Sequence, residues 1–442
     1  MSDFIWGVKD TVEAANGGQD IEMMLTNFFG DKLIKAVKDG FVPESRIDDA
    51  ALRIVRTILA FDRSHKEYDM SVVGCREHIA LAKKVAEKSI TLIKNQNILP
   101  LDRAKVKKLA VIGKLGDTAN IGDHGSSQVR AAYTVTPLEG LKKAHPGCEI
   151  VFDDGSDPER AKKTAAAADA VVFVVGYDHC DEGEFISAEQ SSNYTGGVGG
   201  DRRESLGLHK DDIELLQKVL PANPNHAVVL IGGNMIMMTE WYDLANAVLM
   251  AYYPGQEGGT AIAEILFGDV NPSGKLPFVV PCRESDLPYV DWNAADQYYE
   301  YYHGYTRLDK NGVKPLVPYG FGLSYTSFAF SAPEIFVEGD KLVTRVTVKN
   351  TGSRAGDEVV QLYVGCEKSS VDRPLRQLKG FARVSLNPGE TKPVEIRVPL
   401  EKLKWYDPTH REWKLESTEY TVYTGSSEAL EDLQSTKICL GE

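Results

Sequence analysis

The sequence has 442 residues, of which 43% are hydrophobic and 26% are charged, so it is long enough for two or three domains with buried cores. Its 50 basic and 64 acidic side chains give a formal net charge of −14 without a basic block, which argues against nucleic acid and membrane surfaces as partners. The six cysteines form no C-x-x-C pair and have no histidines at zinc-ligand spacing. We therefore expect isolated buried thiols in a reducing compartment, the cytoplasm, and no metal or other cofactor.

The first elements predicted are two helices. Between Asp31 and Phe61 apolar residues recur at helical spacing, and Gly40 and Pro43 interrupt the pattern where one helix should end and the next begin. The polar stretch "DRSHKEYDM" follows and is typical of a domain boundary. We therefore place the first boundary at residue 70.

An α/β layered domain is predicted over residues 71–330. A helix is expected from Ile79 through Ile93, followed by short apolar strands that alternate with helical stretches. The predicted strands are "KLAVIGK", "CEIVF", "DAVVFVVG", "HAVVLIGG" and "NAVLMAYY". Continuous Val and Ile runs between helices are typical of a parallel sheet that is covered on both faces.

The pattern changes after "YGFGLSYTSFAFSAP". Segments such as "LVTRVTVKN", "EVVQLYVG", "ARVSL", "PVEIRVPL" and "TEYTVYTG" are period-2 strands separated by turn residues, with no helix-length segment among them. Val394, Ile396 and Val398, for example, alternate with charged residues, which indicates one buried and one solvated face. We predict a β-sandwich of the immunoglobulin or fibronectin type III kind over residues 333–440.

Familiar nucleotide and serine-hydrolase motifs are incomplete. In "GDVNPSGKL" the spacing is one residue too long for a phosphate-binding loop, and no Ser or Thr follows Lys275. "AVIGKLGDTANIG" follows a strand but lacks G-x-G-x-x-G, and no G-x-S-x-G elbow occurs. A nucleotide-binding α/β protein is therefore the weakest hypothesis.

The strongest candidate site is a carboxylate-rich loop, "DHCDEGEFIS", directly after the strand "AVVFVVG". It places Glu182 and Glu184 at the carboxyl end of a parallel strand, where open α/β sheets usually bind ligands. Crowded carboxylates raise one another's pKa, which can keep an acid protonated near neutral pH. The alternative interpretation of these residues is a solvated acidic loop without a functional role. Asp3 is a weaker candidate, because an aspartate near a terminus is usually exposed and has no function.

Taken in order, these segments resemble the C-terminal part of the family 3 glycoside hydrolases, the β-glucosidase-type enzymes. "SDFIWG" and "AANGGQDIEM" are similar to that family's Ser-Asp-Trp nucleophile segment and the Gly-x-Asp-x-Glu-Met that follows it, and "KSITLIKNQNILPL" to its domain-joining helix and strand. "AYYPGQEGGTAIAEILFGDVNPSGKLPFVVP" and "PYGFGLSYTSF" resemble its sandwich-domain signatures, and "PLRQLKGFARVSLNPGE" its fibronectin-like module. The likeness spans essentially the whole chain. It implies an α/β sandwich domain plus an all-β fibronectin type III-like sandwich, preceded by the helical C-terminal remnant of a (β/α)8-like barrel over residues 1–70.

The resemblance also implies a retaining mechanism with two carboxyl groups. Asp3 matches the nucleophile that forms a covalent glycosyl-enzyme intermediate. The family's general acid/base is a glutamate on a sandwich-domain loop, often within Glu-Gly-x-Asp-Arg. An insertion, "EFISAEQSSNYTGGV", splits that motif here, so Glu182 is the first choice and Glu184 the close alternative. We expect Asp201 and Arg202, at the end of the split motif, to form an ion pair that holds the loop.

Several residues are expected near the substrate, and most have a structural interpretation as well. Phe4 stands where the family usually has Trp, which either alters the aromatic wall near the aglycone or conserves its stacking. The loop "DHGSS" faces the same sheet end as Glu182 and either shapes the aglycone site or is a turn held by Asp and Ser side chains. The tyrosines of "QYYEYYHGY" offer a sugar-stacking surface or pack in the core. The substrate-binding candidates are Phe4, Trp6, Asp123, His124 and Arg202.

We therefore expect a retaining exo-β-glycosidase of the β-glucosidase type. Its substrate would be an oligosaccharide or β-glycoside with a terminal non-reducing β-linked sugar. A barrel would be supplied upstream in a longer reading frame, by a partner chain or through a homo-oligomer. The alternative is a catalytically inactive fragment or an accessory carbohydrate-binding subunit.

Overall fold

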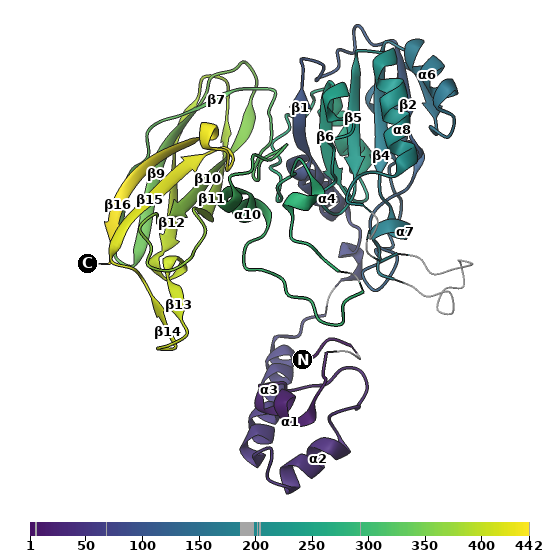
Figure 1. Cartoon of the computed structure of the whole chain (residues 1–442). Helices are drawn as coiled ribbons and strands as arrows, with labels where there is room; N and C mark the ends of the chain where they lie inside the picture. The colour runs from purple at the N-terminus through teal and green to yellow at the C-terminus, as the bar shows by residue number, and fades with distance from the viewer. Residues whose placement is uncertain are drawn as a thin grey trace. The chain divides into compact units, whose positions relative to one another are not determined.

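The computed structural model describes residues 1–4, 7–67, 69–185, 199–200, 202, 205–291 and 293–441. The chain forms two compact units, Met1–Val73 and Gly74–Glu442 (Figure 1). Among the described residues, no helix combines the length and apolar character needed to cross a bilayer.

The first unit is helical. Its helices are α1 (Thr11–Asn16), α2 (Asp31–Lys38) and α3 (Glu44–Ser64), so the predicted helical pair and its interruption at Gly40 and Pro43 are confirmed. They enclose a small core of Val8, Ala15, Phe29, Ala36 and Val42. Much of the apolar surface of α3 is exposed, namely Leu52, Val55, Ile58, Leu59 and Phe61.

The first residues of this unit run beside the segment 21–23. Ser2 N–H donates to the Ile21 carbonyl (2.9 Å), Met23 N–H donates to Ser2 Oγ (2.8 Å), and Phe4 pairs with Met23 in a parallel bridge. Two acidic residues of "GQDIEM" have structural roles, because Asp20 lies 2.6 Å from Arg46 Nη2 and Glu22 accepts hydrogen bonds from two main-chain amides. The motif therefore fixes the path of the chain next to Asp3.

The second unit begins with an α/β domain built on a six-stranded sheet in the order β1-β6-β5-β4-β2-β3. The strands are β1 (Thr91–Asn95), β2 (Lys108–Ile112), β3 (Glu149–Asp153), β4 (Ala170–Gly176), β5 (His226–Ile231) and β6 (Ala247–Tyr252). Strands β2 to β6 pair in parallel, and β1 pairs antiparallel to β6. The five predicted strands are all present, and they are parallel as predicted.

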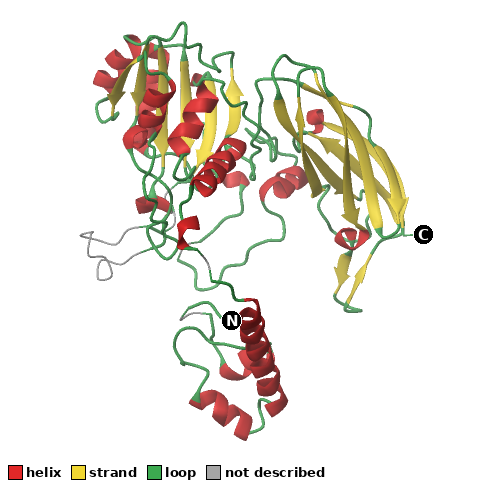
Figure 2. Cartoon of the chain, turned by 180° about the vertical axis from the view of Figure 1, so that it is seen from behind, coloured by secondary structure: helices red, strands yellow, loops and turns green. Residues whose placement is uncertain are grey.

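Helices cover both faces of this sheet (Figures 1 and 2). One apolar cluster packs α4 (Arg76–Ser89), α5 (Pro137–Ala144) and α9 (Gly258–Leu266) on one face, and a second packs α6 (Pro158–Ala166) and α8 (Lys210–Val219) on the other. The chain also contains α7 (His179–Glu182) and α10 (Gly304–Asn311). The covered parallel sheet confirms the predicted fold class of this domain.

One helix boundary was predicted wrongly. The helix expected from Ile79 through Ile93 ends at Ser89, and the next residues form the edge strand β1. Leu92 is fully buried against the sheet, and Thr91 and Leu92 pair with Met250 and Leu249 of β6. Burial against an existing sheet therefore overrides the helical spacing of the preceding residues.

The strand order creates a topological switch point. The chain passes from β2 to β3 on one side of β2 and then returns to β4 on its other side. Connections that leave in opposite directions open a crevice at the carboxyl ends of the two adjacent strands, which here are β2 and β4. The loops carrying Asp123 and Glu182 both begin at this edge.

A β-sandwich follows, as predicted, with one sheet in the order β11-β10-β15-β16 and another in the order β12-β9-β7, with β8 pairing β9. The strands are β7 (Phe328–Phe330), β8 (Glu334–Glu338), β9 (Lys341–Asn350), β10 (Gly356–Gly365), β11 (Gln377–Leu386), β12 (Thr391–Pro399), β15 (Thr418–Gly425) and β16 (Leu433–Leu440), with a hairpin of β13 (Trp405–Asp407) and β14 (Glu412–Lys414). Val394, Ile396 and Val398 are buried and the charged residues between them are exposed, which confirms the period-2 interpretation. The sequence did not indicate β7, β8, β13, β14 or β16.

A buried charge cluster joins α10 to the sandwich. Arg376 Nη2 lies 2.9 Å from Asp309 Oδ1 and 3.6 Å from Glu428 Oε2. Burial and the neighbouring Asp309 carboxylate raise the pKa of Glu428 to about 7, although Arg376 opposes this shift. The Arg376 guanidinium thus faces the half-buried carboxyl group of Asp309 and the buried one of Glu428, and the cluster favours protonation of Glu428.

This cluster predicts a loss of stability as the pH rises. Because the folded pKa of Glu428 is about 7 and the ordinary value is 4.5, the stabilising protonation is complete below pH 4.5 and is lost as the pH rises through 7. We expect the free energy of unfolding to fall by about 2–3 kcal/mol between pH 5 and pH 8 from this group. Urea unfolding at both pH values, with Glu428→Gln as the matched variant, measures it. A pH dependence that is unchanged in Glu428→Gln would contradict the assignment.

Candidate active site

The carboxylate-rich loop is a short helical turn at the end of a buried strand. Asp178 caps α7, because its Oδ1 accepts from Cys180 N–H (2.9 Å), while Asp178 N–H donates to Asp181 Oδ2 (3.0 Å). This capping box fixes the turn. Glu182 is the last residue of α7, and Gly183 then leads to Glu184. Glu182 therefore lies within the helical turn and Glu184 after it, so the two candidate side chains have different neighbours.

Glu182 joins the carboxyl ends of three neighbouring strands. Its Oε1 lies 3.0 Å from Arg202 Nε, and its Oε2 accepts from Tyr253 Oη–H (2.7 Å) and from Gly233 N–H (2.6 Å). Gly233 follows β5 and Tyr253 follows β6. The Glu182 side chain is 11% exposed and that of Arg202 8%. We call Glu182, Arg202, Gly233 and Tyr253 the Glu182 hub.

The environment of the hub explains the identity of its members. Burial and the hydrogen bond to Glu182 raise the pKa of Tyr253, so its hydroxyl stays protonated and acts as the donor. The Arg202 guanidinium also lies 4.3 Å from the Tyr177 ring centroid and donates to the Met235 carbonyl (2.8 Å). A Cβ at position 233 would lie 3.0 Å from the Tyr253 ring, a tight contact that glycine avoids. The hub is thus a packed, charge-assisted hydrogen-bond network.

Glu184 lies with the loop that follows β2. Its main-chain N–H donates to Asp123 Oδ1 (2.8 Å), and Ser126 N–H donates to its Oε2. Glu184 is exposed, unlike Glu182. A Cβ at Gly125 would collide with the Glu184 side chain, which explains the glycine of "DHGSS". The predicted proximity of this loop to the acidic loop is therefore present in the structure.

Asp123 and His124 hold the two loops together. Although burial opposes ionisation, hydrogen bonds from Ser127 Oγ and from main-chain amides, including that of Glu184, lower the pKa of Asp123 to about 2. His124 stacks on His179 of α7, with ring centroids 3.5 Å apart and an angle of 16° between the planes. Burial and the neighbouring His124 lower the pKa of His179. These contacts give Asp123 the role of a turn residue, as one of the two interpretations of the sequence predicts.

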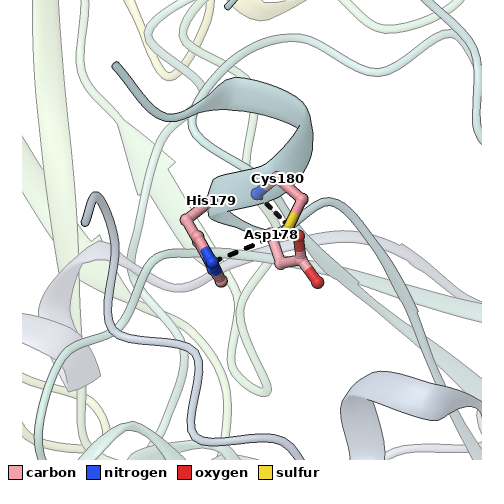
Figure 3. Close-up of side chains that lie close together, drawn as sticks. All are labelled: Asp178, His179 and Cys180. Atoms are coloured by element: carbon pink, nitrogen blue, oxygen red, sulfur yellow. Dashed lines mark hydrogen bonds between the residues drawn. The ribbon is translucent and has the colours of Figure 1, made fainter. Parts of the chain in front are cut away.

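Three consecutive residues, Asp178, His179 and Cys180, have possible metal-ligand atoms within 4.8 Å of one another (Figure 3). The Asp178 carboxylate already accepts the Cys180 amide, and Lys114 Nζ lies 3.2 Å from its other oxygen. Those two contacts hold the pKa of Asp178 below its ordinary value despite burial. A bound cation would have to displace the Lys114 ammonium, so the donor set does not favour a metal.

The remaining sequence candidates lie in the first unit or outside the described residues. Asp3 is exposed, and its Oδ1 accepts a hydrogen bond from Phe4 N–H (2.7 Å). The Phe4 side chain is also exposed. Trp6 and Asp201 fall outside the described residues. The expected Asp201–Arg202 pair therefore stays a prediction, while Glu182 is the ionic partner that the structure gives to Arg202.

The tyrosine cluster divides between packing and exposure. Tyr302 is buried and its hydroxyl donates to Asp372 Oδ1 (2.6 Å), and Tyr305 stacks on Tyr319 with 4.8 Å between ring centroids. The other members of the cluster are exposed, namely Tyr298, Tyr299 and Tyr301. The core-packing interpretation therefore accounts for only part of the cluster.

The chain is similar to known proteins both in its domains and over almost its whole length. Residues 90–325 match the model of the glycosyl hydrolase family 3 C-terminal domain, and residues 358–428 match that of the fibronectin type III-like domain. The chain is 34% identical to thermostable beta-glucosidase B of Acetivibrio thermocellus, over 96% of this chain and 56% of that protein. It is 35% identical to a beta-xylosidase of Formosa agariphila, over 89% of this chain and 55% of that protein.

A solved structure agrees with these relatives. The GH3 beta-glucosidase of Bifidobacterium adolescentis superposes with a TM-score of 0.82 at 28% identity, and the match covers 100% of this chain and 64% of that one. The chain thus spans little more than half the length of the curated relatives it matches. The model of the family's C-terminal domain covers more than half of the chain, and the fold agrees with it. The chain belongs to glycosyl hydrolase family 3.

Proposed function

We propose that this chain supplies both catalytic carboxyl groups of a retaining exo-β-glycosidase of the β-glucosidase type. The substrate is an oligosaccharide or β-glycoside with a terminal non-reducing β-linked sugar. Family membership supports this, since the relatives named above are a beta-glucosidase and a beta-xylosidase. Such chemistry needs one ionised carboxylate that attacks the anomeric carbon and one protonated carboxyl group that releases the aglycone. Asp3 is assigned as the nucleophile.

The contrast between the two loop glutamates carries the assignment of the acid/base. The Glu182 carboxylate contacts the side chains of Arg202 and Tyr253 and the main-chain amide of Gly233. It would have to give up these contacts to protonate a leaving group. Glu184 is also hydrogen-bonded, since its Oε2 accepts from Ser126 N–H, but it is an exposed residue at the carboxyl ends of β2 and β4. We therefore assign Glu184 as the acid/base and Glu182 as the residue that positions its loop, which reverses the order preferred on sequence alone.

We propose in addition that a barrel completes the site. Asp3 is exposed, and a nucleophile in bulk water is neither oriented nor shielded. The exposed apolar residues of α3 support an interaction surface on the same unit. The barrel would come from an upstream segment, a partner chain or another copy. The same exposure of Asp3 favours the alternative of an inactive fragment or accessory carbohydrate-binding subunit if no barrel is supplied.

Hydrolysis of p-nitrophenyl β-D-glucoside and β-D-xyloside tests this proposal. The 442-residue chain is assayed alone and after co-production with the part of thermostable beta-glucosidase B that it does not match. We expect hydrolysis in the co-purified complex, and proton NMR should detect the β-anomer as the first product, because two displacements retain configuration. A co-purified complex without hydrolysis would support the accessory-subunit alternative. An α-anomer as the first product would exclude a retaining mechanism.

A further inference from the structure

A groove lies between α4 and the β-sandwich and shares no residue with the Glu182 hub. Its volume is about 760 Å³. One wall is a stripe of α4, Leu81, Lys84, Val85 and Lys88. The opposite wall comes from β10 and β11, namely Val359, Gln361, Leu378, Phe381 and Arg383. This volume falls within the roughly 300–1,000 Å³ typical of small-molecule sites.

Both walls follow from regular structure. The four residues of α4 follow the i, i+3, i+4, i+7 pattern, which places them on one face of the helix. In the sandwich, Val359 pairs with Arg383 and Gln361 with Phe381 across the two strands, so their side chains share one face of the sheet. Leu81, Val85 and Phe381 are 59%, 60% and 68% exposed. The groove is therefore an apolar surface that is open to solvent.

Its charges are unusual for this chain. Four cations line the groove, Lys84, Lys88, Lys275 and Arg383, and no acidic residue does. Two carboxylates lie behind this lining. Asp357 lies 2.6 Å from Lys88 Nζ, and Glu358 lies 2.9 Å from Lys275 Nζ.

Both carboxylate side chains are 9% exposed, so they do not themselves face a ligand. Arg383 Nη1 also contacts Asp357, at 3.4 Å. Lys84 forms no ion pair within the part of the chain that the structure describes. Four cations less two carboxylates leave two positive charges here, in a chain whose net charge is −14.

We propose that this groove binds an amphipathic organic anion with a single alkyl chain and a carboxylate head, of the fatty-acid type. The alkyl chain lies between the α4 stripe and Phe381, because apolar walls on both sides remove its methylene groups from water. The carboxylate lies at Lys84, the cation whose charge is not already matched. Neutral sugars do not suit a site with these walls, so the proposal is independent of glycoside hydrolysis.

The test measures binding of sodium decanoate to the 442-residue chain by isothermal titration calorimetry. Decanoate is kept below its critical micelle concentration. We expect saturable binding to one site and competition with the fluorescent apolar anion 1-anilinonaphthalene-8-sulfonate. Lys84→Glu should raise the dissociation constant about tenfold, because it replaces an attraction to the carboxylate by a repulsion. The matched control is Lys105→Glu, which makes the same charge change at a side chain that is 84% exposed. Decanol, which has the same chain and no charge, should bind more weakly than decanoate.

Several results would overturn the proposal. They are an absence of saturable decanoate binding, equal binding of decanol and decanoate, or the same effect of Lys84→Glu and Lys105→Glu. Val85→Asp places a charge in the apolar wall and should abolish decanoate binding. If it instead converts a dimer into a monomer in size-exclusion chromatography without changing decanoate binding, the groove is covered by a second copy of the chain.

Discussion

Asp3→Asn is expected to lower kcat/KM for p-nitrophenyl β-D-glucoside by on the order of 10⁴-fold or more, because an amide cannot form the glycosyl ester. The measurement uses the complex that hydrolyses the substrate, with initial rates of nitrophenol release. The folded state should be unaffected, because Asp3 is exposed and its carboxylate accepts one hydrogen bond, from Phe4 N–H, among the described contacts. The loss would therefore report on chemistry and not on stability.

A smaller side chain at the same position gives the matched test. With Asp3→Gly, azide can enter from the side that the carboxylate occupied, and the product should be the α-glycosyl azide, because only one displacement then occurs. Thermal unfolding of both variants, compared with the unsubstituted chain, is the control for folding. If Asp3→Asn retains more than a tenth of the activity, another residue is the nucleophile.

The second large effect is expected at Glu184. Glu184→Gln should lower kcat for an unactivated β-glycoside by about 10²–10⁴-fold, the range for removal of a general acid/base. With a dinitrophenyl leaving group, Glu184→Gln should slow formation of the glycosyl-enzyme much less, because that group departs without protonation. Azide should restore turnover through the glycosyl-enzyme and give the β-glycosyl azide. Steady-state kinetics and NMR of the azide product measure these results.

Glu182→Gln is the matched variant in the same loop. It removes the charge that faces the buried Arg202 guanidinium, which typically costs about 3–5 kcal/mol of stability. Urea unfolding should therefore separate the two glutamates, since Glu184→Gln leaves the Glu182 hub intact. Azide rescue in Glu182→Gln, with none in Glu184→Gln, would reverse the two assignments.

Much of the fold could be predicted because the patterns are strong and local. The Val and Ile runs of β4 and β5 are buried at every position, and the alternation in β12 matches its two faces. The error at β1 arose where a helix passes into a strand within two residues, at Ser89 and Thr91, so local spacing could not locate the change. The short strands β7 and β8 were missed because their pairing with β9 is a tertiary contact.

The candidate site was predictable in position but not in detail. The rule for the carboxyl ends of parallel strands correctly brings the loops of Asp123 and Glu184 together. It could not reveal that Glu182 binds Tyr253 and Gly233, because these partners follow two other strands. The motifs "IGGN" and "AYYPGQ" contain both partners, but nothing in the sequence of either motif indicates a carboxylate partner.

The Glu182 hub also constrains how this domain can be recombined with its relatives. Its members come from positions 182, 202, 233 and 253, so a crossover anywhere between Glu182 and Tyr253 would take one part of the network from each parent. A chimera with such a junction would join loops whose lengths and angles were adjusted to different partners. Junctions before β4 or after Tyr253 would keep the network whole. For this domain, blocks for shuffling are therefore best chosen by the ends of the strands and not by sequence similarity alone.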